Sequence, residues 1–430
     1  MKSVAYGSRA WTRWLEGLPR SSAPRPQVLR AAESIVRAVK REGDPALVRF
    51  TERFDGVRLT PARLHVKPRE IRKLARGADR RVVTALKRMA RRIEDYHRRQ
   101  LEKGFRLESA DGSVLEEIVR PLASAGLYVP GGAGAYPSSV LMGAIPARVA
   151  GVGRIVVVTP PRTLEENPAV GAALEIARVQ DDVYRVGGAQ AVAALAYGTR
   201  AVPAVDRIVG PGNAYVTAAK RLVRGQVEID SEAGPSEVAI LADDRADPGF
   251  VAADLLAQAE HGSGDEVVVL VTPSAELAAE VERLVALGVT SVANTKSTRR
   301  ALSRHAAVVR VKNLDDGVAA VNALAAEHVE VMTHRPERVA RGVVGAAVFV
   351  GPWSPVAVGD YGVGPNHVLP TGGGARFASP LSVRDFQRRQ SVVRMTEAGL
   401  ARVTEDVVRV ALAEGFRGHA QSVLTRFEGE

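Results

Sequence analysis

The sequence predicts an α/β protein with mostly parallel sheets. After about residue 120, short runs rich in Val and Ile alternate with segments whose apolar residues recur at helical spacing. Such alternation is typical of parallel sheets, because each strand needs a crossover helix to return to the starting end of its neighbour. Several of the runs end in glycine-rich turns. Since sheets of this class usually bind ligands beyond the carboxyl ends of their strands, we expect binding sites in these turns.

Eight runs are long and apolar enough to be buried strands, which suffices for two sheets. They are residues 125–130, 154–160, 181–186, 205–210, 237–243, 266–272, 305–311 and 346–351.

Composition excludes several classes of protein. The 430 residues contain no stretch of 18 uncharged apolar residues, and the N-terminal sequence has no signal-peptide core, so we expect a cytoplasmic protein without a membrane partner. The chain has no cysteine, which excludes disulfides, thiolate metal sites and cysteine nucleophiles. Any metal must therefore be bound by imidazole, carboxylate or amide groups.

The net charge of +11 is concentrated in one region. Residues 1–107 hold 28 Lys and Arg against 11 Asp and Glu, so the remainder of the chain is net negative. From Arg69 onward, apolar residues recur at helical spacing between the arginines: Ile71, Leu74, Val82, Leu86, Met89 and Ile93. Aromatic residues suited to base stacking are almost absent there, so the pattern favours a solvated helix face over a nucleic-acid partner.

The segment AQAEH, residues 257–261, carries polar side chains at the end of an apolar helix. Gln258 and His261 are three residues apart, so both side chains can point at one object on a helix face. They either cap the helix or hold a ligand.

Three glycine-rich turns precede predicted helices. Gly131, Gly132 and Gly134 lack the third glycine of a dinucleotide-binding fingerprint, so this turn alone is weak evidence for a nicotinamide cofactor. The turns in 186–199 and 209–220 each run from a strand into a helix, and such turns expose N–H groups that suit phosphate. Each is also compatible with a purely structural turn.

Two polar clusters are hard to explain by packing alone. Glu327 and His328 are neighbours where an apolar helix meets an apolar strand, and they would be costly there without water or substrate. Residues 359–377 combine Asp360 and His367 with six glycines, a pattern too irregular for a helix or a strand and typical of a site. Glu414 and His419, by contrast, look like surface residues of a helical tail.

These blocks, taken in order, resemble the histidinol dehydrogenase family. The resemblance spans about residues 120–423 and rests on YVPGGAGAYPSSVLMGAIPARVAGV, GGAQAVAALAYGT, VGPGNAYVTAAK, AGPSEVAILAD, DLLAQAEH, EHVEVMT, GDYGVGPNHVLPTGGGARF, LSVRDFQRR and GHAQSV. It implies oxidation of L-histidinol through histidinal to L-histidine, the last steps of histidine biosynthesis, with two NAD⁺ and one Zn²⁺ per subunit.

The resemblance also implies roles for individual residues. The zinc ligands would be Gln258, His261, Asp360 and His419, and the acid–base pair would be Glu327 and His328. The substrate would be bound by Ser236, Gln258, His261, His328, Asp360, His367, Glu414 and His419, and NAD by Tyr128, Gln190 and Asn213.

At the level of fold, the resemblance implies two incomplete Rossmann-like domains with small helical terminal pieces. Residues 1–21 would form a helical segment, 22–127 with 237–380 the first domain, 128–236 the NAD-binding domain, and 381–430 a tail exchanged within a homodimer. Glu414 and His419 would then act in the partner's site. Two other functions remain open from the residues alone: a zinc hydrolase with Glu327 as its base, and an RNA-binding protein built on the basic N-terminal region.

Overall fold

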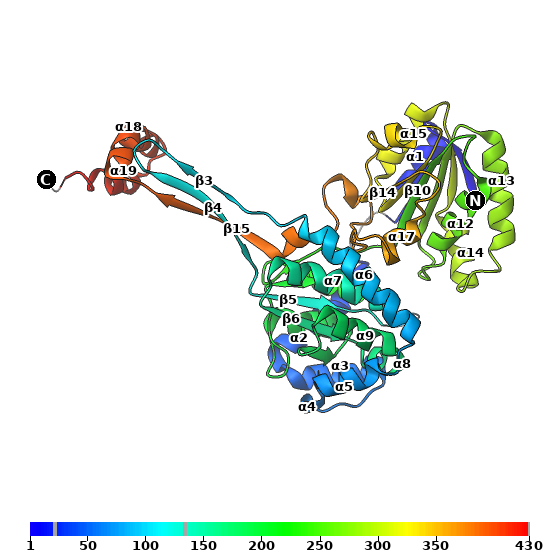
Figure 1. Cartoon of the computed structure of the whole chain (residues 1–430), viewed down its shortest axis with the longest axis horizontal. Coiled ribbons are helices and arrows are strands. Elements are labelled where there is room, and N and C mark those ends of the chain that lie inside the picture. The colour runs from blue at the N-terminus through cyan, green and yellow to red at the C-terminus, as the bar shows by residue number, and fades with distance from the viewer. Residues whose placement is uncertain (20–23, 132–135, 429–430) are drawn as a thin grey trace. The chain divides into compact units, whose positions relative to one another are not determined.

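The computed structural model describes residues 1–19, 24–131 and 136–428 (Figure 1). Gly132 and Gly134 of the first glycine-rich turn, and the predicted boundary after residue 21, lie outside the described residues. The chain forms two compact units: Met1–Gln100 with Leu122–Phe386, and Leu101–Pro121 with Gln387–Glu430.

The first unit contains a six-stranded, entirely parallel sheet. Its strand order is β1-β12-β11-β10-β13-β14. The strands are β1 (Lys2–Ala5), β10 (Glu237–Ala242), β11 (Val267–Thr272), β12 (Ala307–Arg310), β13 (His328–Met332) and β14 (Ala347–Val350). One face packs on α1 (Arg9–Glu16) and α15 (Leu314–Leu324), and the other on α12 (Pro248–Ala259), α13 (Ala275–Gly288) and α14 (Thr295–Arg304) (Figure 1). Two short helices, α16 (Pro336–Ala340) and α17 (Val356–Tyr361), flank β14 in the chain.

A second six-stranded sheet belongs to the same unit, with the order β2-β7-β6-β5-β8-β9. Only the β2–β7 pair is antiparallel. The strands are β2 (His65–Val66), β5 (Ser124–Tyr128), β6 (Arg154–Thr159), β7 (Val183–Arg185), β8 (Arg207–Val209) and β9 (Glu228–Ile229).

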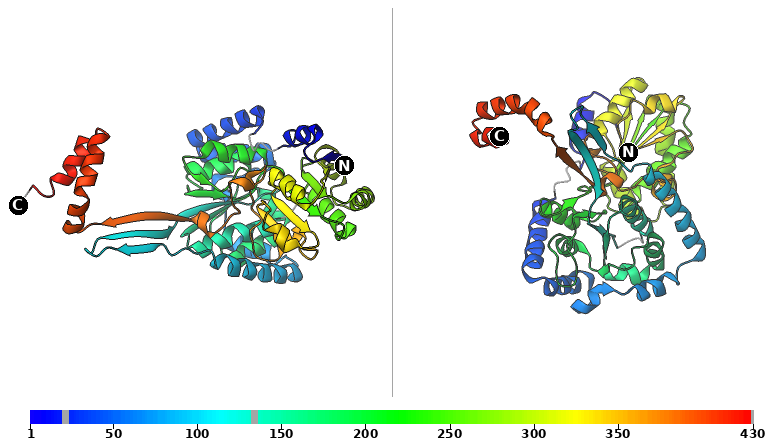
Figure 2. Two further views of the ribbon diagram at one scale, coloured as in Figure 1. Left: turned by 90° about the horizontal axis from the view of Figure 1, so that it is seen from above. Right: turned by 60° about the vertical axis from the view of Figure 1, so that its left-hand side comes forward.

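Helices cover both faces of this second sheet. One face packs on α2 (Pro26–Glu42), α3 (Asp44–Asp55), α10 (Gly188–Tyr197) and α11 (Ala214–Val223). The other packs on α5 (Pro68–Ala75), α6 (Arg80–Arg98), α7 (Pro137–Ala150) and α9 (Pro168–Ala177). This part of the chain also contains two short helices, α4 (Pro61–Leu64) and α8 (Pro161–Glu166). Figure 2 shows α2 and α6 on opposite sides of the sheet.

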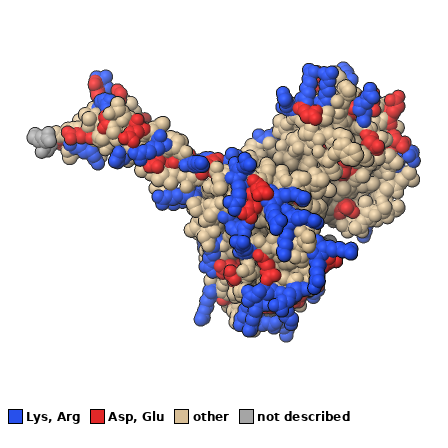
Figure 3. Space-filling view, in the orientation of Figure 1, with Lys and Arg blue, Asp and Glu red and all other residues tan. Residues whose placement is uncertain are grey.

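The structure confirms the predicted α/β class, the parallel sheets and all eight predicted strands. The helical spacing from Arg69 onward is also confirmed. Ile71, Leu86, Met89 and Ile93 are buried, whereas Val82 is exposed. The arginines between them lie on the outer surface of α5 and α6, where Figure 3 shows Lys and Arg side chains gathered.

The division of residues 22–127 differs from the predicted one. We assigned them to the domain of residues 237–380, but α2 and α3 pack on the sheet that contains β5 to β9. The reason is the apolar face of these helices, with Ile35, Val36, Val39 and Phe50, which is buried against α10 and α11. The N-terminal segment also holds a strand as well as a helix, since β1 pairs with β12.

The second unit is a three-stranded antiparallel sheet followed by two helices. The sheet has the order β15-β4-β3, formed by β3 (Phe105–Glu108), β4 (Val114–Pro121) and β15 (Gln387–Arg394). The helices are α18 (Glu397–Ala413) and α19 (Arg417–Leu424). The region predicted as a helical tail therefore begins with a strand. Across the described residues of both units, no helix is long and apolar enough to cross a membrane.

Candidate active site

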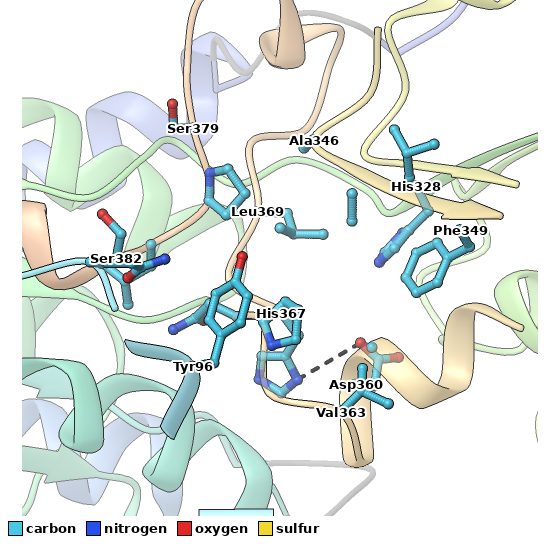
Figure 4. Close-up of a pocket in the computed structure, with 18 of the residues that line it drawn as sticks. Tyr96, His328, Ala346, Phe349, Asp360, Val363, His367, Leu369, Ser379 and Ser382 are labelled. Atoms are coloured by element: carbon cyan, nitrogen blue, oxygen red, sulfur yellow. Dashed lines mark ion pairs between the residues drawn. The ribbon is translucent and has the colours of Figure 1, made fainter. Parts of the chain in front are cut away.

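A cavity of about 410 Å³ in the first unit brings three predicted site residues together. His328, Asp360 and His367 all line it (Figure 4). The Nδ1 atom of His367 lies 3.8 Å from Oδ1 of Asp360. Asp360 sits on the short helix α17, although we predicted that residues 359–377 form neither helix nor strand. An acidic group and two imidazoles therefore share one enclosed space.

Glu327 and His328 lie at the amino end of their strand. Ala325 ends α15 in the left-handed conformation, with a φ of 44°, and His328 begins β13 two residues after Ala326. In the parallel register, His328 pairs with Val238, so the starts of β13 and β10 are adjacent. Glu327 and His328 thus lie at the amino edge of their sheet, whereas we expected ligand sites beyond the carboxyl ends.

Glu237 binds both members of this pair, a role that the sequence reasoning missed. The backbone N–H of Glu237 donates to Oε2 of Glu327 at 3.1 Å, and the N–H of Glu327 donates to Oε2 of Glu237 at 3.3 Å. Nδ1 of His328 lies 3.2 Å from the carbonyl oxygen of Glu237. This contact favours the tautomer with the proton on Nδ1, which leaves Nε2 of His328 as a base. The available signal was a charged residue at the first position of the otherwise apolar strand EVAILA.

Burial shifts the proton affinity of both catalytic candidates. It raises the pKa of Glu327 to about 8, while the Glu237 N–H and the Ser236 hydroxyl, which donates to Glu327, lower it. Burial also lowers the pKa of His328 to about 4, so its imidazole is neutral at pH 7. Glu327 therefore exchanges its proton close to neutral pH, which suits a general acid or base.

Burial also disfavours the charged forms of His367 and Asp360. It lowers the pKa of His367 to about 4 and raises the pKa of the Asp360 carboxyl. Protonation of the nearby His328 or His261 would oppose this shift of the Asp360 carboxyl, so these side chains lie within electrostatic range of one another.

The loop that carries His367 is fixed by its neighbour Asn366. The Nδ2 group of Asn366 donates to the carbonyl oxygen of Met142 at 2.7 Å, and its Oδ1 accepts from the Val368 N–H at 2.9 Å. Nε2 of His367 also lies 3.4 Å from the hydroxyl of Ser139. The irregular segment is thus held against α7.

Gln258 and His261 lie at the end of α12, as the sequence predicts. The side chain of Gln258 is 1% exposed, and among the described residues neither its Oε1 nor its Nε2 has a hydrogen-bond partner. His261 follows the end of the helix, and its Nδ1 lies 3.0 Å from the Gln258 carbonyl oxygen. Across residues 1–19, 24–131 and 136–428, no group of three or more His, Asp or Glu side chains stands close enough to hold a metal ion.

A second cavity, of about 720 Å³, brings the three predicted NAD residues together. Tyr128, Gln190 and Asn213 all line it, at the carboxyl ends of β5, β7 and β8. This cavity lies at the edge of the sheet where we expected binding sites. The Tyr128 hydroxyl accepts from the N–H of Gly188 at 3.1 Å, and the side chain of Asn213 caps α11.

Glu414 and His419 belong to the second unit. Glu414 follows the last turn of α18 and His419 lies on α19, and both are exposed. The ring of His419 contacts that of Phe416, with centroids 5.1 Å apart.

The structure combines two mostly parallel sheets, a buried acid–imidazole pair and a separate cavity at the carboxyl ends of strands. This combination is typical of an α/β enzyme. The sequence profile of histidinol dehydrogenase matches residues 18–427. The chain belongs to the histidinol dehydrogenase family, whose members are oxidoreductases of histidine biosynthesis.

Individual relatives agree with this assignment. The chain is 48% identical to a histidinol dehydrogenase of Rhodopseudomonas palustris, with 92% of each chain covered. It is 44% identical to one of Methanothermobacter thermautotrophicus, with 93% of each covered. The crystal structure of histidinol dehydrogenase from Elizabethkingia anophelis matches with a TM-score of 0.91 at 32% identity, covering 100% of this chain and 98% of that one.

Proposed function

We propose that the protein oxidises L-histidinol through histidinal to L-histidine in one active site, with two NAD⁺ and a zinc ion. The observation that carries the proposal is the buried pair Glu327 and His328, held by Glu237 beside the cavity that also contains Asp360 and His367. A four-electron oxidation of this kind needs a base for two hydroxyl protons and a second base for water.

The residues at the end of α12 fit a zinc site. The amide of Gln258 is buried, and neither of its polar atoms has a hydrogen-bond partner among the described residues. Such buried polar groups are rare in folded proteins, and a bound ligand would supply the missing partner. The contact between His261 Nδ1 and a backbone carbonyl leaves Nε2 directed elsewhere, which is the usual arrangement of a metal-binding histidine. Gln258, His261 and Asp360, with His419, would hold the ion. When bound, zinc would fix the amino and imidazole nitrogens of histidinol, because it is a Lewis acid that accepts N and O ligands.

His328 would accept the proton of the substrate hydroxyl as the hydride leaves carbon. Its low pKa keeps it neutral and ready for this task. Glu327 would then take a proton from water as that water adds to the aldehyde carbon, and His328 would return its proton to the former carbonyl oxygen, giving a gem-diol and leaving His328 neutral again. His328 would accept the hydroxyl proton of the gem-diol during the second hydride loss, which leaves the carboxyl group of histidine. Ser236 donates to Glu327 and so lies where substrate and base would meet.

The second cavity supports a site for NAD⁺. It is of a size common for cofactor sites, and it lies at the end of the sheet where such cofactors usually bind. Tyr128, Gln190 and Asn213 would contact the dinucleotide. When bound, NAD⁺ would accept the hydride.

A homodimer would place Glu414 and His419 in the partner's site. The second unit exposes several large apolar side chains, and exposed apolar patches commonly mark protein interfaces. Its most exposed large apolar side chains are Phe105, Leu107, Val393, Val410, Leu412 and Phe416.

Metal removal tests the zinc part of the proposal. Extensive treatment with a chelator should abolish formation of NADH from L-histidinol, and stoichiometric Zn²⁺ should restore it. Metal analysis of each sample is the control. Full activity in protein shown to be free of metal would contradict the assignment.

A further inference from the structure

Lys220 and Asp230 form a buried ion pair next to the second cavity. Their side chains are 3% and 4% exposed, and Nζ of Lys220 donates to Oδ1 of Asp230. Two charges removed from water lose much hydration free energy, so they are tolerated only when their remaining hydrogen-bonding groups are also paired. The partners of those groups therefore show what the pair holds in place.

Lys220 and Asp230 each bind one backbone group of the same residue, Gly210. Nζ of Lys220 donates to the Gly210 carbonyl oxygen at 3.0 Å, and Oδ2 of Asp230 accepts from the Gly210 N–H at 2.7 Å. Oδ1 of Asp230 also accepts from the N–H of Ser231 at 2.6 Å. The ion pair thus binds both the N–H and the carbonyl group of Gly210.

Gly210 is in close contact with the backbone of Tyr128. Its φ is +112°, and a Cβ atom at this position would lie 2.2 Å from the Tyr128 carbonyl oxygen. Only glycine fits such a place. Tyr128 lines the cavity, and so does Asn213, three residues after Gly210. The position of Gly210 therefore affects how two residues that line the cavity are placed.

We propose that Lys220 and Asp230 are positioning residues for the dinucleotide: by fixing Gly210 against Tyr128, they hold Asn213 in its binding position. The inference rests on the proposed function, because it takes the second cavity as the NAD⁺ site. It differs from a purely stabilising role, in which the pair would matter only for folding.

The test compares three variants with the wild-type protein. Lys220→Met/Asp230→Leu removes both charges and leaves neither partner buried alone, so it should fold, whereas Lys220→Met strands the Asp230 charge and should lower Tm. Val223→Ala, on the same helix α11 and also buried, is the matched control because it weakens the packing of the helix without touching Gly210. The readouts are Tm, the Kd of NAD⁺ by calorimetry, and KM for NAD⁺ and for L-histidinol.

The double variant should fold with a moderately lower Tm, because the buried N–H and carbonyl groups of Gly210 lose their partners. Its Kd and KM for NAD⁺ should rise by about tenfold, because the loop must then be ordered on binding. Its KM for L-histidinol should stay within about twofold, and Val223→Ala should lower Tm without changing the Kd, since distant sites act independently. An unchanged Kd in the folded double variant, or an equal rise of Kd in Val223→Ala, would overturn the inference. Failure of the proposed function looks different: wild-type protein would not bind NAD⁺, or Asn213→Ala would leave its Kd unchanged.

Discussion

Glu327 and His328 are neighbours in the chain, but the proposed chemistry gives them different proton transfers. Glu327→Gln should slow oxidation of histidinal by about 10²-fold or more and affect oxidation of histidinol less, because only the aldehyde must add water. Assay of the two half-reactions, with histidinol and with histidinal as the starting substrate, measures this directly.

His328→Ala should slow both half-reactions by a similar factor, since a hydroxyl proton leaves in each. Equal losses in both half-reactions for the two variants alike would show that the roles are divided wrongly.

Among single residues, the sequence motifs predict the groups that carry chemistry better than the groups that orient them. His328, Asp360 and His367 were predicted and line one cavity. Glu237 and the Lys220–Asp230 pair were not predicted. Their roles arise from contacts between residues that are far apart in the chain or on opposite sides of a turn, such as the 90 residues between Glu237 and Glu327. The spacing of residues along the chain does not predict such contacts.

Among elements, two neighbouring carboxyl groups, the buried Glu330 and the partly buried Asp254, link α12, β13 and α17. Asp254 on α12 faces Glu330 on β13, and Oε1 of Glu330 accepts from the N–H of Val356, the first residue of α17, at 2.8 Å. Burial, and then the charge of Asp254, raise the pKa of Glu330 to about 9, and burial raises the pKa of Asp254 to about 6. When one of the two carboxyl groups is protonated, its O–H can donate a hydrogen bond to the other. Two carboxylates would have no donor between them.

This pair predicts how stability depends on pH. The folded-state pKa of Glu330 lies above its ordinary value of 4.5, so between about pH 4.5 and 9 the folded protein binds more protons than the unfolded chain. The free energy of unfolding should therefore fall as pH rises through this range. Glu330→Gln removes the titration but keeps an acceptor for the Val356 N–H.

Thermal unfolding at several pH values between 5.5 and 9 measures the effect. The decrease of Tm with pH should be shallower in Glu330→Gln than in wild type, by roughly a few degrees over the range. Glu276→Gln, which changes an exposed carboxylate on α13, should run parallel to wild type. Parallel curves for Glu330→Gln would contradict the account of this pair.

Most of the strands that the sequence predicts are buried on both faces, with β14 an exception. Strands such as β10 and β11 are apolar along their whole length, and this pattern is typical of parallel sheets. The missed strands are short or exposed, like β2 and β3, so their residues carry little apolar signal. The strand β1 was missed because its pairing with β12 joins residues about 300 positions apart.

For the whole molecule, the proposed homodimer predicts complementation between inactive subunits. His261→Ala and His419→Ala should each inactivate the protein. If the second unit of one chain completes the site of its partner, a heterodimer of the two has one site with both defects and one with neither. Subunit exchange should then restore up to about half of the wild-type activity per heterodimer, by the symmetry of a two-fold assembly. No recovery despite demonstrated exchange would show that His419 serves its own chain.

The domain division was the least predictable feature at this scale. Residues 26–55 form two amphipathic helices that fit the face of either parallel sheet by pattern alone. Their placement against α10 and α11 depends on the complementary shape of side chains in those helices, which a single sequence does not reveal.

The stoichiometry of the reaction tests the central claim most directly. If one active site carries out both oxidations, purified protein with zinc and excess NAD⁺ should form two NADH for each L-histidinol consumed, with L-histidine as the product and no free histidinal in solution. One NADH per L-histidinol, with histidinal accumulating, would contradict the proposal that a single site completes both steps.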